Sequence, residues 1–571
     1  MDEGLLAPDL QSEQPTGHCS AITRFNQGRR ALAILLFIQT LQGAALWSIT
    51  LSVITYSTFF LNFSPKAVTA TSIIVTGTSY VLSLPIAWFA DRKVGCFVVL
   101  AVALPVYTAG AGLIAASALK TKPSDAADLS DRSDSYDIAT FVSGIVLAGF
   151  GASSVRAVLM PYMLDQLGDG SQRRSVIASF CTISFFFINV GAVLAIGLGL
   201  WLCREPRFWV QTPEYHDSYN FFWLFLIAPV CLLGCCIALV FGKSTLITRY
   251  PCADLGARVP SLRSIIRAGC CFSCERRDFN VRVQEGAVQQ QSAISALTKS
   301  LSAFVPVLSS LVIYYMTDAQ YSSSFTEQSL HMNIYKNGSY LPSSQQPNET
   351  CNMTTASQHD SNFSPLLVTI INPLMFLLFL PIYQWIIRPL WEVIAKKEMT
   401  LLDRILFGMI VALLACLSAT LVELFRVKSR FYFLCLHLGK AHTLHVFSSL
   451  SFYYQVPQYS LMGIAEVFSL VASAEFVLSR APRQVRCTAI GFYFFVTGVG
   501  NYLGACLIYA LRSFDLYYDD PSTEEHISTA VTRAENSKAY VFFICVDVVI
   551  FVNMLIFVFI KNRNWIARRA V

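Results

Sequence analysis

The stretch Tyr459-Ser-Leu-Met-Gly-Ile-Ala-Glu466-Val-Phe-Ser-Leu-Val-Ala-Ser-Ala-Glu475-Phe-Val-Leu478 is long and apolar enough to cross a bilayer, yet it contains two glutamates. A helix needs about 20 mostly apolar residues to span the hydrocarbon core. Glu466 falls near the middle of the run, where an ionisable side chain is costly unless it faces a protein-lined cavity. The run therefore predicts a membrane helix with a functional acid.

Helical geometry separates the two glutamates of this run. At about 100° per residue, Glu475 lies on the opposite face from Glu466 and about 13 Å further along the axis. We expect Glu475 to pair with Arg480 or Arg483 at the end of the helix. Glu466 is then the acid at mid-membrane depth.

The composition of the whole chain is typical of a membrane protein with many spans. Of its 571 residues, 54% are hydrophobic and only 14% are charged, which differs from a soluble domain. The first 30 residues are polar and the first apolar run is too long for a cleavable signal peptide, so we expect none. Apolar runs predict twelve spans, at residues 31–58, 67–89, 94–118, 138–164, 175–202, 218–242, 296–317, 365–388, 402–424, 455–479, 485–511 and 539–560.

Basic residues set the expected orientation, because Lys and Arg in short loops stay on the cytoplasmic side. With the amino terminus inside, several basic clusters fall on that side: Arg29 and Arg30, Arg92 and Lys93, Arg173 and Arg174, and Arg568 and Arg569. Both termini are then cytoplasmic. The formal charge of +6 is explained by this topology, so the sequence does not indicate nucleic-acid binding.

The polar segments between the spans contain candidate modification sites. The expected outer loop at 318–364 has sequons for N-glycosylation at Asn337, Asn348 and Asn352. A basic cytoplasmic segment contains a cluster that fits reversible palmitoylation better than zinc binding, formed by Cys270, Cys271 and Cys274. The spans contain no Ser-His-Asp arrangement, metal-ligand cluster or phosphate-binding loop, so we expect no enzyme, metal or cofactor.

The twelve spans form two groups of six on either side of a polar segment. Two six-helix bundles around a central cavity are typical of the major facilitator fold, in which one bundle rocks against the other. We expect this all-α membrane fold, with a cytoplasmic tail at 1–30, bundles at 31–242 and 296–560, a cytoplasmic linker at 243–295 and a tail at 561–571. The first tail begins Met1-Asp-Glu-Gly-Leu-Leu6, an acidic dileucine pattern that favours an endolysosomal membrane over the plasma membrane.

Arg156 is the deep basic residue of the first six spans, and its expected counter-charge across the cavity is Glu466 or Asp318. A positive wall facing a negative wall suits a zwitterion, such as an amino acid or a short peptide. The alternative is an ion pair that only holds the two bundles together.

Several motifs resemble those of the proton-coupled oligopeptide transporters, particularly their peptide/histidine branch. The most specific lie in the tenth span: Tyr454-Gln-Val-Pro-Gln-Tyr459, Gly463-Ile-Ala-Glu466 and Glu475-Phe-Val-Leu-Ser-Arg-Ala-Pro482. Others follow in the family's order: Ser79-Tyr80, Ala90-Asp91-Arg-Lys-Val-Gly95, Val155-Arg156-Ala157, Phe185-Phe-Phe-Ile-Asn189-Val-Gly191, Val305-Pro306 and Asn372-Pro373.

The resemblance implies a proton-driven secondary transporter of di- or tripeptides or amino acids, with histidine among the candidate substrates. Glu466 matches the glutamate that receives the peptide amino terminus, and Asn189 and Asn372 match residues that hold its backbone. Arg156 replaces a lysine that contacts the carboxylate end, and it keeps the charge. The implied binding residues are Tyr80, Arg156, Asn189, Tyr315, Asn372, Glu466 and Tyr493, with Tyr315 and Tyr493 standing where many members have tryptophan.

The chain also departs from this family. In the first span, Gln39, Gln42 and Gly43 replace the ionisable residues of the ExxER motif. In the seventh span the acidic position aligns with Ala319, and Asp318 is one residue early, rotated by about 100°. Proton coupling must therefore use Asp318 and Glu466, or it is weakened or lost. Two alternatives stay open: a non-transporting scaffold that recruits a cytoplasmic signalling adaptor, and a transporter of another organic anion.

Overall fold

The computed structural model describes residues 17–59, 61, 76–119, 130–167, 174–202, 219–247, 305–330, 332, 365–437, 441–481, 483–514, 516 and 538–562. Within these ranges, ten helices are long and apolar enough to cross a membrane. They are Gly28–Thr50, Cys96–Ser117, Ile138–Asp165, Arg174–Gly199, Phe221–Gly242, Val368–Ala395, Leu401–Lys428, Phe452–Arg480, Arg486–Leu511 and Tyr540–Asn562.

The membrane-spanning part is helical, as expected. Its α-helices are α1 (Gly17–Phe59), α3 (Ser83–Phe89), α4 (Cys96–Ser117), α5 (Ser130–Asp165), α6 (Arg174–Leu202), α7 (Tyr219–Gly242), α11 (Val305–Asp318), α12 (Ser324–Leu330), α13 (Ile371–Ile382), α14 (Arg388–Ala395), α15 (Leu401–Lys428), α16 (Val456–Arg480), α17 (Arg486–Arg512) and α19 (Tyr540–Asn562). Of the twelve expected spans, 67–89 and 296–317 lie partly outside the described residues, and α3 and α11 cover their later portions.

The strands in the described part form one antiparallel hairpin. β1 (Arg430–His437) pairs with β2 (Ala441–Ser448), with Arg430 opposite Ser448. The aromatic and β-branched residues of this segment favour strands, and the segment lies between two spans. This loop therefore adds one hairpin, which the sequence analysis did not predict, to an otherwise helical fold.

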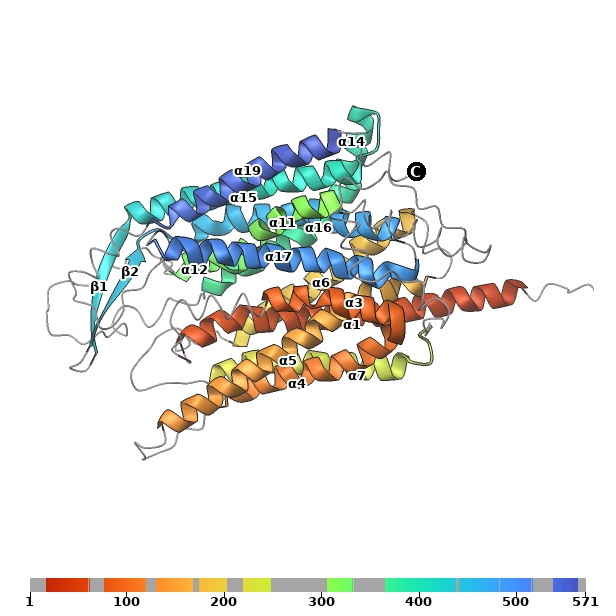
Figure 1. Cartoon of the computed structure of the whole chain (residues 1–571), viewed down its shortest axis with the longest axis horizontal. Coiled ribbons are helices and arrows are strands. Elements are labelled where there is room, and N and C mark those ends of the chain that lie inside the picture. The colour runs from red at the N-terminus through yellow and green to blue at the C-terminus, as the bar shows by residue number, and fades with distance from the viewer. Residues whose placement is uncertain are drawn as a thin grey trace, which may run out of the picture.

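The helices lie side by side in two sets (Figure 1). In this view α1 and α3 to α7 lie on one side, and α11 to α19 lie on the other. The start of α1 and the end of α19 lie at the same end of the molecule, which we call the tail end. The β1–β2 hairpin projects from the opposite end, which we call the hairpin end.

Two glycines allow neighbouring helices to pack with their backbones in close contact. A Cβ atom at Gly191 on α6 would lie 2.1 Å from the Thr40 carbonyl oxygen on α1. A Cβ atom at Gly463 on α16 would lie 2.4 Å from the Asn372 carbonyl oxygen on α13. Small residues at such crossings are typical of membrane helices, whose packing depends on backbone approach.

The outer helix faces are apolar and exposed. Phe241 and Trp385, for example, expose 82% and 80% of their surface. In a bilayer these side chains would contact lipid, which is as apolar as the protein core. The polar groups of interest are therefore those inside the helix assembly.

Candidate functional site

A cavity lies between the two sets of helices. It has a volume of about 130 Å³, and α1, α5 and α6 line it opposite α11, α16 and α17. Its polar and aromatic lining consists of Gln39, Gln42, Trp47, Tyr80, Arg156, Phe185, Asn189, Asp318, Tyr321, Glu466, Tyr493, Phe494 and Thr497. A smaller hollow of about 70 Å³ shares Trp47, Tyr80, Arg156 and Tyr321 with it.

Arg156 on α5 is held by its own half of the molecule. Its Nη1 donates a 2.8 Å hydrogen bond to Ser79 Oγ, and its guanidinium carbon lies 3.9 Å from the centre of the Tyr80 ring. Within the described ranges Arg156 forms no ion pair, so the expected pairing with Glu466 or Asp318 is not formed in this conformation. A cation–π contact leaves the edge of a guanidinium able to bind a carboxylate.

Glu466 on α16 is positioned by a neighbouring amide. Asn372 Nδ2 on α13 donates a 2.8 Å hydrogen bond to Glu466 Oε1. Gly463 lies one turn before Glu466 on the same helix and allows α13 to approach there. Asn372 is fully buried and is not among the residues that line the cavity, so it lies behind the acid and orients it.

Asp318 lines the same cavity as Glu466 despite its one-residue offset from the family position. It is the last residue of α11, and the tighter 3-10 turn Ala319–Ser322 follows it directly. Because a 3-10 turn has about three residues per turn, the α-helical phase does not continue past Asp318. Asp318 Oδ1 is buried without a hydrogen-bond partner. Two carboxyl groups and one arginine thus face one cavity.

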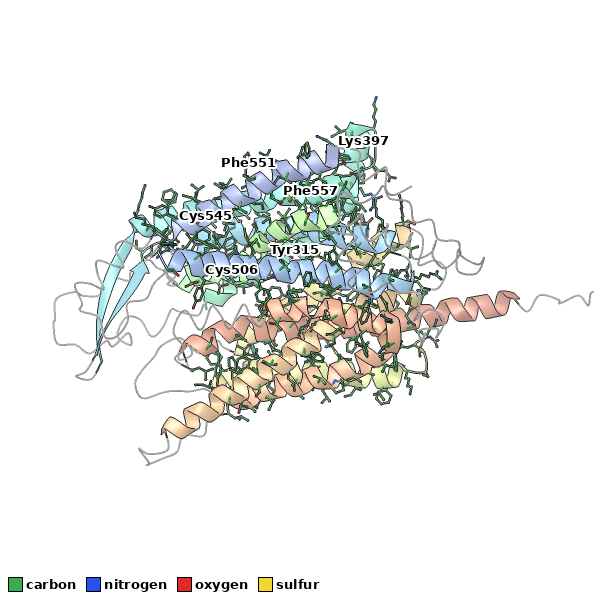
Figure 2. The ribbon with its side chains drawn as sticks, viewed as in Figure 1. Tyr315, Lys397, Cys506, Cys545, Phe551 and Phe557 are labelled. Atoms are coloured by element: carbon green, nitrogen blue, oxygen red, sulfur yellow. The ribbon has the colours of Figure 1, made fainter. Side chains whose placement is uncertain are left out.

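Five of the seven predicted binding residues line the cavity, and two lie behind it. Tyr80, Arg156, Asn189, Glu466 and Tyr493 belong to the lining. Tyr315 is fully buried in the interior (Figure 2), and its ring packs edge-on against Tyr493 with centroids 5.8 Å apart. Tyr315, like Asn372, therefore supports a lining residue instead of facing the cavity.

The three residues that replace the first-span motif do not all face the cavity. Gln39 and Gln42 line the cavity with uncharged amides. Gly43 instead packs against α6, since a Cβ atom there would lie 2.8 Å from the Ile188 carbonyl oxygen. An arginine at Gly43 would clash with that backbone in this arrangement.

Sequence reasoning missed Ser79, Trp47 and Tyr321. Trp47 and Tyr321 have ring centroids 5.7 Å apart and join α1 to the turn after α11. A signal for Trp47 was available, because it stands eight residues after Gln39, a spacing that keeps to one face of a helix. No local signal identified Ser79 as the partner of Arg156.

Glu475 lies away from the cavity, as helical phase predicted, but its partner is not the one expected. Its Oε2 accepts a 2.9 Å hydrogen bond from Arg404 Nη1 on α15, and both side chains are almost fully buried. Arg480 instead packs over the Phe476 ring, 4.1 Å from its centre. Five residues of helix place Arg480 about 140° around the axis from Glu475, which turns it away.

At the tail end, polar contacts connect the two sets of helices. Asp91 lies in the π-helical turn Ala90–Val94 after α3, and its Oδ2 accepts 2.7 Å hydrogen bonds from the Thr488 backbone N–H and hydroxyl in the first turn of α17. Arg486 Nη1 donates to Asp165 Oδ1 at the end of α5, at 3.2 Å. These contacts close this end of the molecule.

The Asp91 contact predicts a pH-dependent closure. Burial raises the pKa of the Asp91 carboxyl to about 7, although the Thr488 hydrogen bonds oppose the rise. When the end opens and Asp91 is hydrated, we expect an ordinary pKa of about 4. Between about pH 4 and about pH 7, Asp91 is therefore protonated in the closed state and ionised in the open state. Lowering the pH from about 7 towards about 4 favours closure, and this contribution to closure is lost as the pH rises through about 7.

Hydrogen–deuterium exchange in the first turn of α17, corrected for the intrinsic effect of pH, measures this closure. Protection in the wild-type protein should rise as the pH falls from above 7 to about 5. Asp91→Asn, which has no proton to bind, should show nearly constant protection. The same pH dependence in both proteins would disprove the assignment to Asp91.

Several sequence predictions fall outside the described residues. They include the glycosylation sites Asn337, Asn348 and Asn352, the cluster Cys270, Cys271 and Cys274, the dileucine pattern, and nearly all of the linker. They stay predictions.

Comparisons with known proteins agree with this helical membrane fold. The family model PTR2, described as POT family, matches residues 351–519. Mouse solute carrier family 15 member 3 is 26% identical over 521 residues, which cover 85% of this chain and 84% of that protein. Arabidopsis thaliana protein NRT1/PTR FAMILY 8.5 is 23% identical over 535 residues, covering 85% and 82%.

Solved structures share the fold. A crystal structure of an auto-inhibited POT family peptide transporter superposes with a TM-score of 0.63 at 16% identity, covering 94% of this chain and 97% of that one. A POT family transporter in complex with 5-aminolevulinic acid gives a TM-score of 0.62 at 14% identity, covering 93% and 96%. This multi-pass membrane protein therefore matches the POT family model over residues 351–519 and shares the fold of solved POT family transporters, a family whose members are transporters and not enzymes.

Proposed function

We propose that this protein is a proton-linked secondary transporter of short peptides or free amino acids, with histidine among the substrates to test. Its twelve spans would form bundles at 31–242 and 296–560 with both termini on the cytoplasmic side. The positions of the start of α1 and the end of α19 at the same end of the molecule support this topology. The tail end would then face the cytoplasm.

The observation that carries the proposal is a cavity with one arginine and two acids among its lining residues. A zwitterionic substrate would place its carboxylate on Arg156 and its ammonium on Glu466. Asn189 would hold a backbone amide, and Tyr80 and Tyr493 would form the walls. The transporter solved with 5-aminolevulinic acid, a small molecule with an amine and a carboxylate, supports this substrate class.

The size of the cavity favours small substrates. Its volume of about 130 Å³ is below the 300 Å³ or so of typical ligand pockets. A single amino acid or a dipeptide requires the least expansion of the helices around it. Tripeptides would require a wider conformation.

Proton coupling would use Asp318 and Glu466, because the side-chain amides of Gln39 and Gln42 do not gain or lose protons at physiological pH. Repulsion between two carboxylates in one buried cavity disfavours the state in which both are ionised. A substrate ammonium arriving at Glu466 would favour its ionised form and release a proton. This exchange of a proton for an ammonium links substrate binding to proton movement.

Uptake of labelled histidine and a labelled dipeptide into proteoliposomes with an imposed pH gradient tests the proposal. Accumulation should exceed that of empty vesicles and increase with the gradient. Uptake that ignores the gradient would disprove the coupling alone. If uptake equals that of empty vesicles at every pH, transport is disproved, and a cytoplasmic partner whose binding survives Arg156→Ala would support the adaptor-recruiting scaffold. The endolysosomal membrane, the adaptor and the glycosylation remain proposals from the sequence.

A further inference from the structure

Two cysteines from different halves of the molecule meet at the tail end. Cys96 Sγ and Cys487 Sγ lie 3.1 Å apart, although 391 residues separate them in sequence. Both are free thiols in this structure. Cys96 begins α4 and Cys487 is the second residue of α17, so the contact joins one set of helices to the other.

The surroundings of this pair are those of the closed tail end. Thr488, the next residue after Cys487, donates both hydrogen bonds to Asp91. Arg486, the residue before it, pairs with Asp165. Three independent contacts between the two sets of helices therefore fall on consecutive residues of α17. The end cannot open toward the tail side without separating the two sulfurs.

The pair also has the accessibility of a redox-sensitive dithiol. Cys96 is half-buried, whereas Cys487 exposes only 2% of its surface. Each lies in the first turn of its helix, so the contact is formed between two helix starts. Sensor cysteines commonly combine an accessible thiol with a resolving cysteine beside it. Cys96 fits the first position and Cys487 the second.

We propose that Cys96 and Cys487 form a reversible disulfide that locks the tail end closed. With hydrogen peroxide as the two-electron oxidant, the Cys96 thiolate attacks one peroxide oxygen, the O–O bond breaks, and a sulfenic acid and hydroxide form. The hydroxide takes the proton that the Cys96 thiol gave up and becomes the first water. The Cys487 thiolate then attacks the sulfenic sulfur, the S–O bond breaks, and the leaving hydroxide takes a proton to become a second water. Two thiols and one peroxide thus give one disulfide and two waters.

The lock would arrest the transport cycle in one conformation. A disulfide holds its two sulfurs about 2.05 Å apart. The first turn of α4 and the first turn of α17 could not separate while the disulfide is present. In a reducing cytoplasm the pair would remain as thiols and the transporter would cycle. Oxidation would then stop transport, and a thiol reductant would restore it.

Peptide mapping of the full-length protein in membranes tests the bond itself. After mild hydrogen peroxide, with free thiols blocked before digestion, mass spectrometry should find a Cys96–Cys487 linked peptide that disappears with dithiothreitol. Cys506→Ser is the matched control, because Cys506 lies on the same helix but is exposed and near the hairpin end (Figure 2). Absence of the linked peptide in wild type and control, while free thiols elsewhere are oxidised, would overturn the proposal.

The consequence is tested by transport with the same proteins and depends on the proposed function. Peroxide should lower uptake at least tenfold in the wild type and in Cys506→Ser, with recovery in dithiothreitol, and should leave Cys96→Ser unaffected. Equal peroxide inhibition of Cys96→Ser would show that the bond is not the lock. If no variant transports even when reduced, the proposed function fails, while the mapping result still decides whether the bond forms.

Discussion

Glu466→Gln is expected to lower the initial rate of dipeptide uptake by about 100-fold. The substitution keeps the shape of the side chain and the position of the Asn372 contact but removes the charge that would receive the substrate ammonium. Loss of one partner from a buried charge pair costs about 2–5 kcal/mol, and 2.7 kcal/mol corresponds to about 100-fold. Uptake of a labelled dipeptide in proteoliposomes, corrected for the amount of folded protein, measures the effect.

Glu475→Gln is the matched control, because it makes the same chemical change on the same helix but outside the cavity. It removes the charge partner of Arg404, which is almost fully buried. Such a loss destabilises a protein by about 3–5 kcal/mol, so we expect less folded protein and a lower midpoint of thermal unfolding. Uptake per folded molecule should stay near the wild-type level. If both variants lose the same uptake per folded molecule, the separation of the two acids is wrong.

Arg156→Ala is expected to lower kcat/KM for a dipeptide with a free carboxylate by about 30- to 100-fold. Charge-assisted hydrogen bonds between a guanidinium and a carboxylate contribute about 1.5–3 kcal/mol, and the cavity contains no other described cation among its lining residues. A dipeptide whose carboxylate is replaced by a carboxamide should be transported at similar, low rates by both proteins. The comparison measures the carboxylate contact and not the general state of the protein.

Arg156→Lys provides a second comparison for this residue. Lysine keeps the charge but lacks the planar fork that can contact Ser79, the Tyr80 ring and a carboxylate together. For the dipeptide with a free carboxylate, we therefore expect Arg156→Lys to have a kcat/KM between that of the wild type and that of Arg156→Ala. If Arg156→Ala reduces transport of the acid and the amide by the same factor, Arg156 is not the carboxylate site.

Much of the cavity lining follows from short-range patterns. The helix at Tyr459–Leu478 and the separation of Glu466 from Glu475 were predictable, because span length and helical phase depend only on neighbouring residues. Asp318 also lines the cavity, although its one-residue offset from the family position predicted a rotation of about 100°. The β1–β2 hairpin was not predicted, because the apolar runs that identify membrane spans do not report on strands in the loop between two spans.

Hydropathy and helical phase were enough to predict membrane helices, an arginine and a glutamate that line the cavity, and a second glutamate that faces away from it. Each of these depends on hydropathy and helical spacing, which are local properties of the chain. The partners of these groups follow from helix packing: Ser79 and Tyr80 for Arg156, Asn372 for Glu466, Arg404 for Glu475, and Cys96 beside Cys487. These contacts depend on which helices pack together and at what rotation, which helical spacing within one segment does not contain.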